Sequence, residues 1–151
     1  MNSTLSENPW VPAPAAWLGY AGLIPFVTLA VGLWLVSSDY QTQLNEPLLA
    51  YAGIILSFMG AVHWGLAMEN GDTKEPRQLA VSVLPALVAW FAGFTPPMFN
   101  YSLLILGFTG LCIFDVRMAR LGKTPAWYPK LRIPLTVVVV MSLILAQLAM
   151  L

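Results

Sequence analysis

The sequence predicts an all-α protein that crosses a membrane as a bundle of five helices. Of its 151 residues, 58% are hydrophobic and only 9% are charged, whereas soluble domains carry about 25% charged residues. The chain also contains several apolar runs of about 20 residues, the length that crosses a bilayer. A soluble fold of this size needs more charged residues than this to cover its surface. We therefore expect most of the chain to be surrounded by lipid.

Five membrane-spanning helices are expected after a mobile tail at residues 1–13. They cover residues 14–36, 47–68, 76–94, 98–118 and 133–150, and residues 37–45 are expected to form a polar linker. Pro47, Pro76 and Pro134 suit the first turn of a helix, and the Pro96-Pro97 pair ends the third span. Pro25 predicts a kink within the first span, since it leaves a carbonyl without its donor. The third span is the shortest, so four spans with a re-entrant third segment are the alternative count.

The basic residues predict the orientation of the chain. All seven lie in two connections, with Lys74 and Arg77 in one and Arg117, Arg120, Lys123, Lys130 and Arg132 in the other. In a five-span chain these connections share a side, so the positive-inside rule places them and the N-terminus in the cytoplasm and the C-terminus in the periplasm. Residues 117–132 also contain Trp127 and Tyr128, and this segment is expected to lie at the level of the lipid headgroups.

The start of the chain predicts the location of the protein. Residues 1–11 contain neither Lys nor Arg, whereas a signal peptide begins with positive charge and a mitochondrial transit peptide is rich in Arg. We therefore expect a multi-pass protein of the bacterial inner (plasma) membrane that is inserted without cleavage.

The apolar run at residues 53–68 is expected to be the packing centre of the bundle. Its sequence is GIILSFMGAVHWGLAM, which contains the only histidine of the chain, His63. The run also carries a face of small residues, which allow another helix to approach closely. These are Gly53, Ser57, Gly60 and Ala61, and the expected partners within the chain are Gly19 and Gly22. A second copy or a partner subunit is the alternative occupant of this face.

A candidate polar site is expected in the cytoplasmic half of the bilayer. Its residues are His63, Trp64, Ser82, Asp115, Arg132 and Tyr20. Ionisable residues inside a membrane are costly, so a functional role is the first hypothesis for them. His63, Asp115 and Arg132 are therefore candidates to bind a headgroup, a quinone ring or a proton. In the alternative interpretation, His63 bonds to a carbonyl or to Ser82 and only fixes helix packing. Asp115 and Arg132 then form an interfacial ion pair, with Arg132 just outside the fifth span.

Composition and motifs argue against several other classes of protein. The formal net charge is zero, whereas nucleic-acid binding needs a basic face. Cys112 is the single cysteine, so the sequence predicts neither a disulfide framework nor a metal site. No GxSxG or HExxH motif is present, and no enzyme is predicted. No cofactor is expected; haem held by His63 with Met59 or Met68, and a quinone, are the alternatives.

Four motifs resemble a known membrane family. They are LGYAGLIPF (residues 18–26), YAGIILSFMGAVHWGLAM (51–68), SVLPALVAW (82–90) and PAWYPKLRIPLT (125–136). The sequence is similar to an integral-membrane domain of unknown function that occurs in proteobacteria and in an animal mitochondrial transmembrane protein. The resemblance implies a multi-span membrane protein and supplies no activity, so no catalytic residue is carried over.

Two functions remain open from the sequence. The first is a non-enzymatic accessory or assembly protein that acts through helix packing, for example with an energy-transducing complex. The second is a small carrier or binding protein for a lipid, a quinone or a proton. The expected partners are the lipid bilayer and either another membrane protein or a second copy of the chain.

Overall fold

Helices account for most of residues 10–69 and 76–151, the part of the chain that the computed structural model describes. They are α1 (Ala13–Ala21), α2 (Ile24–Leu35), α3 (Ser38–Glu69), α4 (Pro76–Ala92), α5 (Pro97–Arg120) and α6 (Tyr128–Ala149). The all-α prediction is confirmed. Most of the expected tail, residues 1–9, and Lys74 lie outside the described residues.

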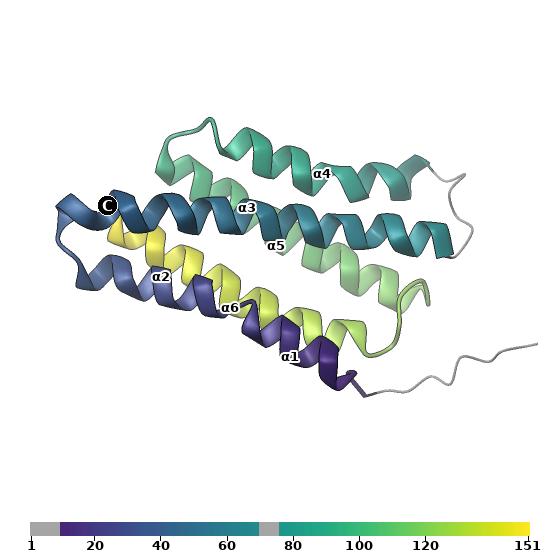
Figure 1. The fold of residues 1–151 in the computed structure, drawn as a ribbon. Coiled ribbons are helices and arrows are strands. Elements are labelled where there is room, and N and C mark those ends of the chain that lie inside the picture. The colour runs from purple at the N-terminus through teal and green to yellow at the C-terminus, as the bar shows by residue number, and fades with distance from the viewer. Residues whose placement is uncertain (1–9, 70–75) are drawn as a thin grey trace, which may run out of the picture.

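The helices lie side by side along one long axis (Figure 1). The start of α1, the end of α3, the start of α4, the end of α5 and the start of α6 are all at the same end of the bundle. The end of α2, the end of α4, the start of α5 and the C-terminus of the chain are at the opposite end. Neighbouring helices in the chain therefore run in opposite directions, with α1 and α2 forming a single broken rod.

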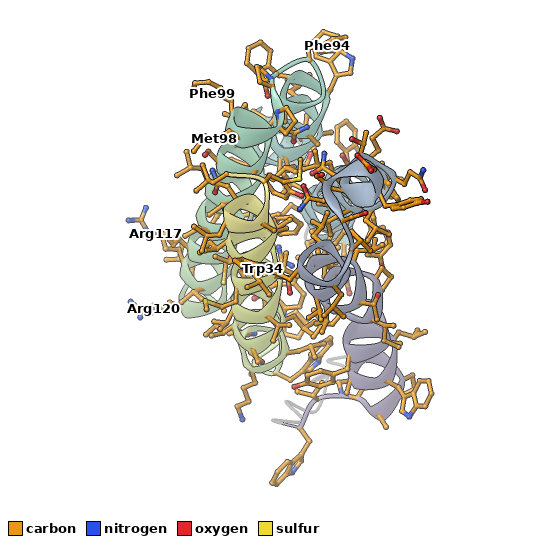
Figure 2. All side chains as sticks on the ribbon, turned by 90° about the vertical axis from the view of Figure 1, so that its left-hand side faces the viewer. Trp34, Phe94, Met98, Phe99, Arg117 and Arg120 are labelled. Atoms are coloured by element: carbon orange, nitrogen blue, oxygen red, sulfur yellow. The ribbon has the colours of Figure 1, made fainter. Side chains whose placement is uncertain are left out.

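Four segments of the described chain are long and apolar enough to cross a membrane. They are Ala13–Leu35, Ser38–Glu69, Pro97–Arg120 and Tyr128–Ala149, and a shorter apolar helix covers Leu79–Ala92. Large apolar side chains cover the outside of the bundle, and Figure 2 shows Phe94, Met98 and Phe99 pointing away from it. Soluble monomers rarely expose such extensive apolar surface, so this is the surface of a membrane protein.

The first rod is broken rather than only kinked at Pro25. Helix α1 ends at Ala21 and α2 begins at Ile24, so Gly22 and Leu23 stand between them. The Tyr51 hydroxyl of α3 donates a hydrogen bond of 3.0 Å to the carbonyl of Gly22. Pro25 leaves the carbonyl of Ala21 without its helical donor, and the Tyr51 bond caps the carbonyl of the next residue, so α3 stabilises the break.

Two helices begin earlier than the sequence predicts. Helix α3 starts at Ser38, so the expectation of a polar linker at residues 37–45 is wrong over most of its length. Asn45 is buried in this extension, where its Oδ1 accepts a hydrogen bond of 2.7 Å from the Tyr101 hydroxyl. Helix α6 starts at Tyr128, and Pro129 rather than Pro134 takes its first turn. The expected headgroup segment is therefore helical from residue 128 onward.

Gly53 and Gly60 of the small face of α3 pack against α4, whereas Ala61 is exposed. A Cβ atom added to Gly60 would lie 2.7 Å from the backbone oxygen of Ser82, and one added to Gly53 would lie 3.6 Å from Cβ of Ala89. Of the two expected partners, Gly19 instead faces Leu131 and Leu135 of α6, and Gly22 lies beside the Tyr51 hydroxyl of α3. The spacing of small residues identified a close helix contact, but the partner helix was predicted wrongly.

Candidate functional site

Asp115 joins two other ionisable side chains in a buried cluster. Its Oδ1 lies 2.5 Å from Nε2 of His63, and its Oδ2 accepts a hydrogen bond of 2.6 Å from Nε of Arg132. His63 and Asp115 have no exposed surface, and Arg132 is 4% exposed. These three residues, called here the His–Asp–Arg triad, connect α3, α5 and α6.

The triad lies closer to one end of the bundle than to the other. At 1.5 Å of rise per residue, His63 is about 9 Å from the end of α3, Asp115 about 8 Å from the end of α5 and Arg132 about 6 Å from the start of α6. All three helix termini belong to the end of the bundle that also carries the start of α1. The triad therefore lies inside the helices, one to two turns from their ends.

The turn between α5 and α6 places Asp115 opposite Arg132. Gly122 follows the end of α5 with a φ of +69°, which suits a residue without a Cβ. The backbone N–H of Gly122 bonds to the carbonyl of Ala119, and that of Lys123 bonds to the carbonyl of Met118. This is the Schellman pattern that ends a helix and reverses the chain, so the sequence brings the two charged residues together locally.

Several polar atoms around the triad have no hydrogen-bond partner within the described chain. They are Nδ1 of His63, Nη2 of Arg132 and the Tyr128 hydroxyl, all of which are buried. The His63 ring packs edge-on against Phe114, with 4.9 Å between the ring centroids. Most buried polar groups in proteins are hydrogen-bonded, and exceptions need an explanation. The guanidinium and phenol groups are thus available to a further acceptor.

An apolar cavity of about 350 Å³ lies beside the triad. Its walls come from α1, α2, α3, α5 and α6, and both Arg132 and Tyr128 line it. His63 and Asp115 are not among the lining residues, so Arg132 is the member of the triad that lines the cavity. A pocket of this kind, with apolar walls and few polar groups, is typical of a small-molecule site.

The structure brings together only part of the polar site that the sequence predicts. His63, Asp115 and Arg132 meet, and Arg132 is buried inside α6 instead of lying outside the span. Ser82 is buried on α4, but its hydroxyl donates to the carbonyl of Leu79 at 2.6 Å and not to His63. Trp64 and Tyr20 are not joined to the triad.

Those two aromatic residues face outward. Trp64 is 46% exposed and Tyr20 is 51% exposed. Among the described residues, no group of three His, Cys, Asp or Glu side chains is placed to hold a metal ion.

Sequence reasoning missed Tyr128 as a member of the site. Its position beside Trp127 and Lys130 is typical of an interfacial anchor. This pattern gives no indication that Tyr128 also lines the cavity. The pairing of Tyr128 with Arg132 four residues later, on one helix face, is the signal that points to a shared environment. Both side chains line the same cavity.

The fold and the site together define a multi-span membrane protein with a buried ionisable triad. The chain belongs to the family described as "Protein of unknown function (DUF3429)", which it matches over residues 11–148. It is 38% identical to Transmembrane protein 69 of Xenopus tropicalis and 30% identical to Transmembrane protein 69 of Mus musculus, over 137 residues in each case. These alignments cover 88% of this chain and 53% and 55% of the relatives, so the chain spans about half their length. No solved structure matches the chain significantly.

Proposed function

We propose that this protein binds a membrane amphiphile in the cavity beside the His–Asp–Arg triad. The single observation that carries the proposal is the pair of buried, unpartnered groups, Nη2 of Arg132 and the Tyr128 hydroxyl, on residues that line an apolar cavity. The polar head of an amphiphile can accept hydrogen bonds from the unpartnered donors, and its apolar body can fill the apolar cavity. The amphiphile occupies the site as a bound or carried molecule, without chemical change.

The energetics of burial support a binding role over a purely structural one. Ionisable groups inside a membrane are costly, and a buried ion pair often stabilises a fold no better than apolar residues of the same size. Close packing between helices is already provided elsewhere, for example by Gly60 against α4. A bundle that needed only to pack therefore gains little from the triad, whereas a ligand site gains a fixed and oriented donor.

We also propose that the bundle crosses a bacterial inner membrane five times, with the N-terminus in the cytoplasm. The antiparallel order of the helices supports this arrangement, because it sets the end of α3 and the start of α4 at the same end of the bundle as the end of α5 and the start of α6 (Figure 1). In Figure 2, Arg117 and Arg120 project outward from α5 near this end. Cytoplasmic connections carry such an excess of Lys and Arg in inner-membrane proteins.

The proposal is tested by purifying the full chain in a gentle detergent and measuring its bound molecules by native mass spectrometry. We expect about one amphiphile per chain in the wild type. The variant Val139→Phe places a larger side chain in the cavity wall and is expected to lose the amphiphile, whereas Val137→Phe, on the exposed face of the same helix, retains it. An empty wild-type protein, or equal occupancy in the two variants, contradicts the proposal.

An accessory role in assembly is the second candidate. It is supported by Ala61 and Gly65 of α3, two small residues that are exposed, with no atom within 4 Å of the place where a Cβ on Gly65 would lie. Small residues four positions apart let a further helix approach. The same purification discriminates the two candidates, because a protein subunit bound in stoichiometric amount supports assembly and a lone chain with a small molecule supports binding.

A further inference from the structure

We infer that the head of the bound amphiphile is an uncharged planar ring that carries carbonyl oxygen, as in isoprenoid quinones. This inference rests on the proposed function and names the ligand class of the same cavity. Four observations lead to it: the buried donors on residues that line the cavity, the balance of charge in the triad, the aromatic side chains in the walls, and the size and edge of the cavity.

Two of the residues that line the cavity, Arg132 and Tyr128, carry buried hydrogen-bond donors. The guanidinium of Arg132 has N–H groups only, and Nε already donates to Asp115 while Nη2 has no partner within the described chain. The unpartnered Tyr128 hydroxyl can donate as well. A head that binds here must therefore present acceptor oxygens, and a carbonyl oxygen with its two lone pairs meets this requirement.

The charge balance of the triad favours an uncharged head. The carboxylate of Asp115 already bonds to Arg132 with one oxygen and to His63 with the other. A second carboxylate or a phosphate next to Arg132 would bring an additional negative charge close to Asp115 in a site without exposed surface. The positive charge of Arg132 is already balanced by Asp115, so a bound anion would leave a buried net negative charge, which is costly. A fatty-acid anion therefore fits worse than a ketone or a quinone.

Aromatic side chains make up much of the cavity wall. Those that line it are Phe26, Phe58, Phe108, Trp127 and Tyr128, from α2, α3, α5, the N-cap of α6 and α6 itself. Aromatic rings favour offset-stacked or edge-to-face contact with another ring. A flat ring therefore makes better contact with these walls than a branched glycerol head.

The size and the edge of the cavity suit a ring with a single chain. Its volume of about 350 Å³ is near the lower limit for small-molecule sites. Leu18 of α1 and Phe58 of α3, which also line it, are 72% and 62% exposed, so the cavity reaches the lipid-facing surface between these helices. An apolar tail can leave there into the bilayer while the ring stays beside Arg132.

The test measures binding of four probes with equal chains to the purified full-length protein by isothermal titration calorimetry in one detergent. The probes are a decyl-substituted para-benzoquinone, decylbenzene, monodecanoylglycerol and decanoate. We expect the quinone to bind at least tenfold more tightly than the other three. Tyr128→Phe is expected to weaken quinone binding about fivefold, the loss of one ordinary hydrogen bond, and Tyr40→Phe, at an exposed tyrosine of α3, to leave it unchanged.

Arg132→Lys gives a second measurement, because it keeps a cation for Asp115 but removes the Nη donors. Quinone affinity is expected to fall by about tenfold or more, and Arg117→Lys, at an exposed arginine, serves as its control. Equal or tighter binding of decanoate or monodecanoylglycerol, or no effect of Tyr128→Phe, overturns this inference and leaves the amphiphile site in place. A wild-type protein that binds none of the probes and carries no amphiphile overturns both proposals.

Discussion

Asp115 is the residue on which the polar interior depends. Each of its two carboxylate oxygens bonds to a side chain from a different helix, His63 of α3 and Arg132 of α6. Charge-assisted hydrogen bonds are about twice as strong as neutral ones, and both of these are shielded from solvent. Removing this one carboxylate therefore leaves two partners unpaired at once.

Asp115→Asn is expected to destabilise the protein strongly. The variant leaves the Arg132 guanidinium buried without a counter-charge, which typically costs about 3–5 kcal/mol. The measurement is the free energy of unfolding in mixed micelles, or the midpoint of thermal unfolding in one detergent. Glu46→Gln removes an exposed carboxylate from α3 and is the matched control.

A double variant tests whether the two charges of Asp115 and Arg132 are needed for stability at all. Replacing both partners, as Asp115→Leu with Arg132→Met, removes the unpaired charge and is expected to be less destabilising than Asp115→Asn alone. A double variant that unfolds as easily as the single one argues that the pair is required for the fold itself.

At the residue scale, the sequence predicted the neighbourhood and, in the structural alternative, the ion pair between Asp115 and Arg132, but not the contact between Asp115 and His63. His63 and Asp115 were both predicted in the cytoplasmic half of the bilayer, because each lies a few residues from a helix end on the same side. Arg132 was placed outside its helix because Pro134 was taken as the first-turn proline, a position that Pro129 holds in the structure. The pairing of residues 52 positions apart depends on how three helices rotate against each other, which sequence spacing does not determine.

At the scale of helices, the contact between α3 and α4 depends on the absence of side chains. Gly60→Ala would bring a Cβ to 2.7 Å from the Ser82 oxygen and 2.9 Å from Cγ of Pro85. Such overpacking typically costs about 1–3 kcal/mol. We expect a lower free energy of unfolding, measured in mixed micelles, because the two backbones must separate.

Gly65→Ala on the same helix is the control for this substitution. No atom lies within 4 Å of the added Cβ, and alanine is the better helix former by about 0.5–1 kcal/mol. Its stability is expected to be unchanged or slightly higher. Equal effects of the two alanines would show that close packing at Gly60 is unimportant.

The break between α1 and α2 yields a second expectation at this scale. Tyr51→Phe removes the hydrogen bond to the Gly22 carbonyl and keeps the ring contact with Phe26, whose centroid lies 5.1 Å away. The free energy of unfolding is expected to fall by about 1 kcal/mol, and amide hydrogen exchange around Gly22 to become faster. Tyr40→Phe, at an exposed tyrosine, should change neither.

Helix existence was predictable from the sequence, while helix bounds and partners were not. Because a lipid-facing chain must satisfy its backbone bonds internally, apolar run length identified every helical segment, although it predicted α1 and α2 as one helix. Pro47 led to a late start for α3, because a proline near a helix end was assumed to mark that end. Gly19 was paired with the wrong helix, because small residues reveal a close approach without naming the neighbour.

At the scale of the whole molecule, charge and helix order make a prediction about sidedness. The described end of α5 and the turn that follows carry Arg117, Arg120 and Lys123, and the C-terminus lies at the opposite end of the bundle. A reporter enzyme fused after Leu151 is expected to be active only in the periplasm. A reporter inserted after Lys123 is the control and is expected to be active in the cytoplasm. A cytoplasmic signal from the first fusion contradicts the five-span arrangement.

Neighbouring helices of unequal length have a consequence for the surrounding lipid. Helix α3 has 32 residues and α4 has 17, which correspond to about 48 Å and about 26 Å, beside a hydrocarbon core of about 30 Å. To match the short helix α4, the bilayer must become thinner on that side of the protein. The first turns of the longer helix α3 then extend beyond the hydrocarbon core. The protein is thus expected to partition toward thinner bilayers, drawn there by hydrophobic mismatch along a single flank.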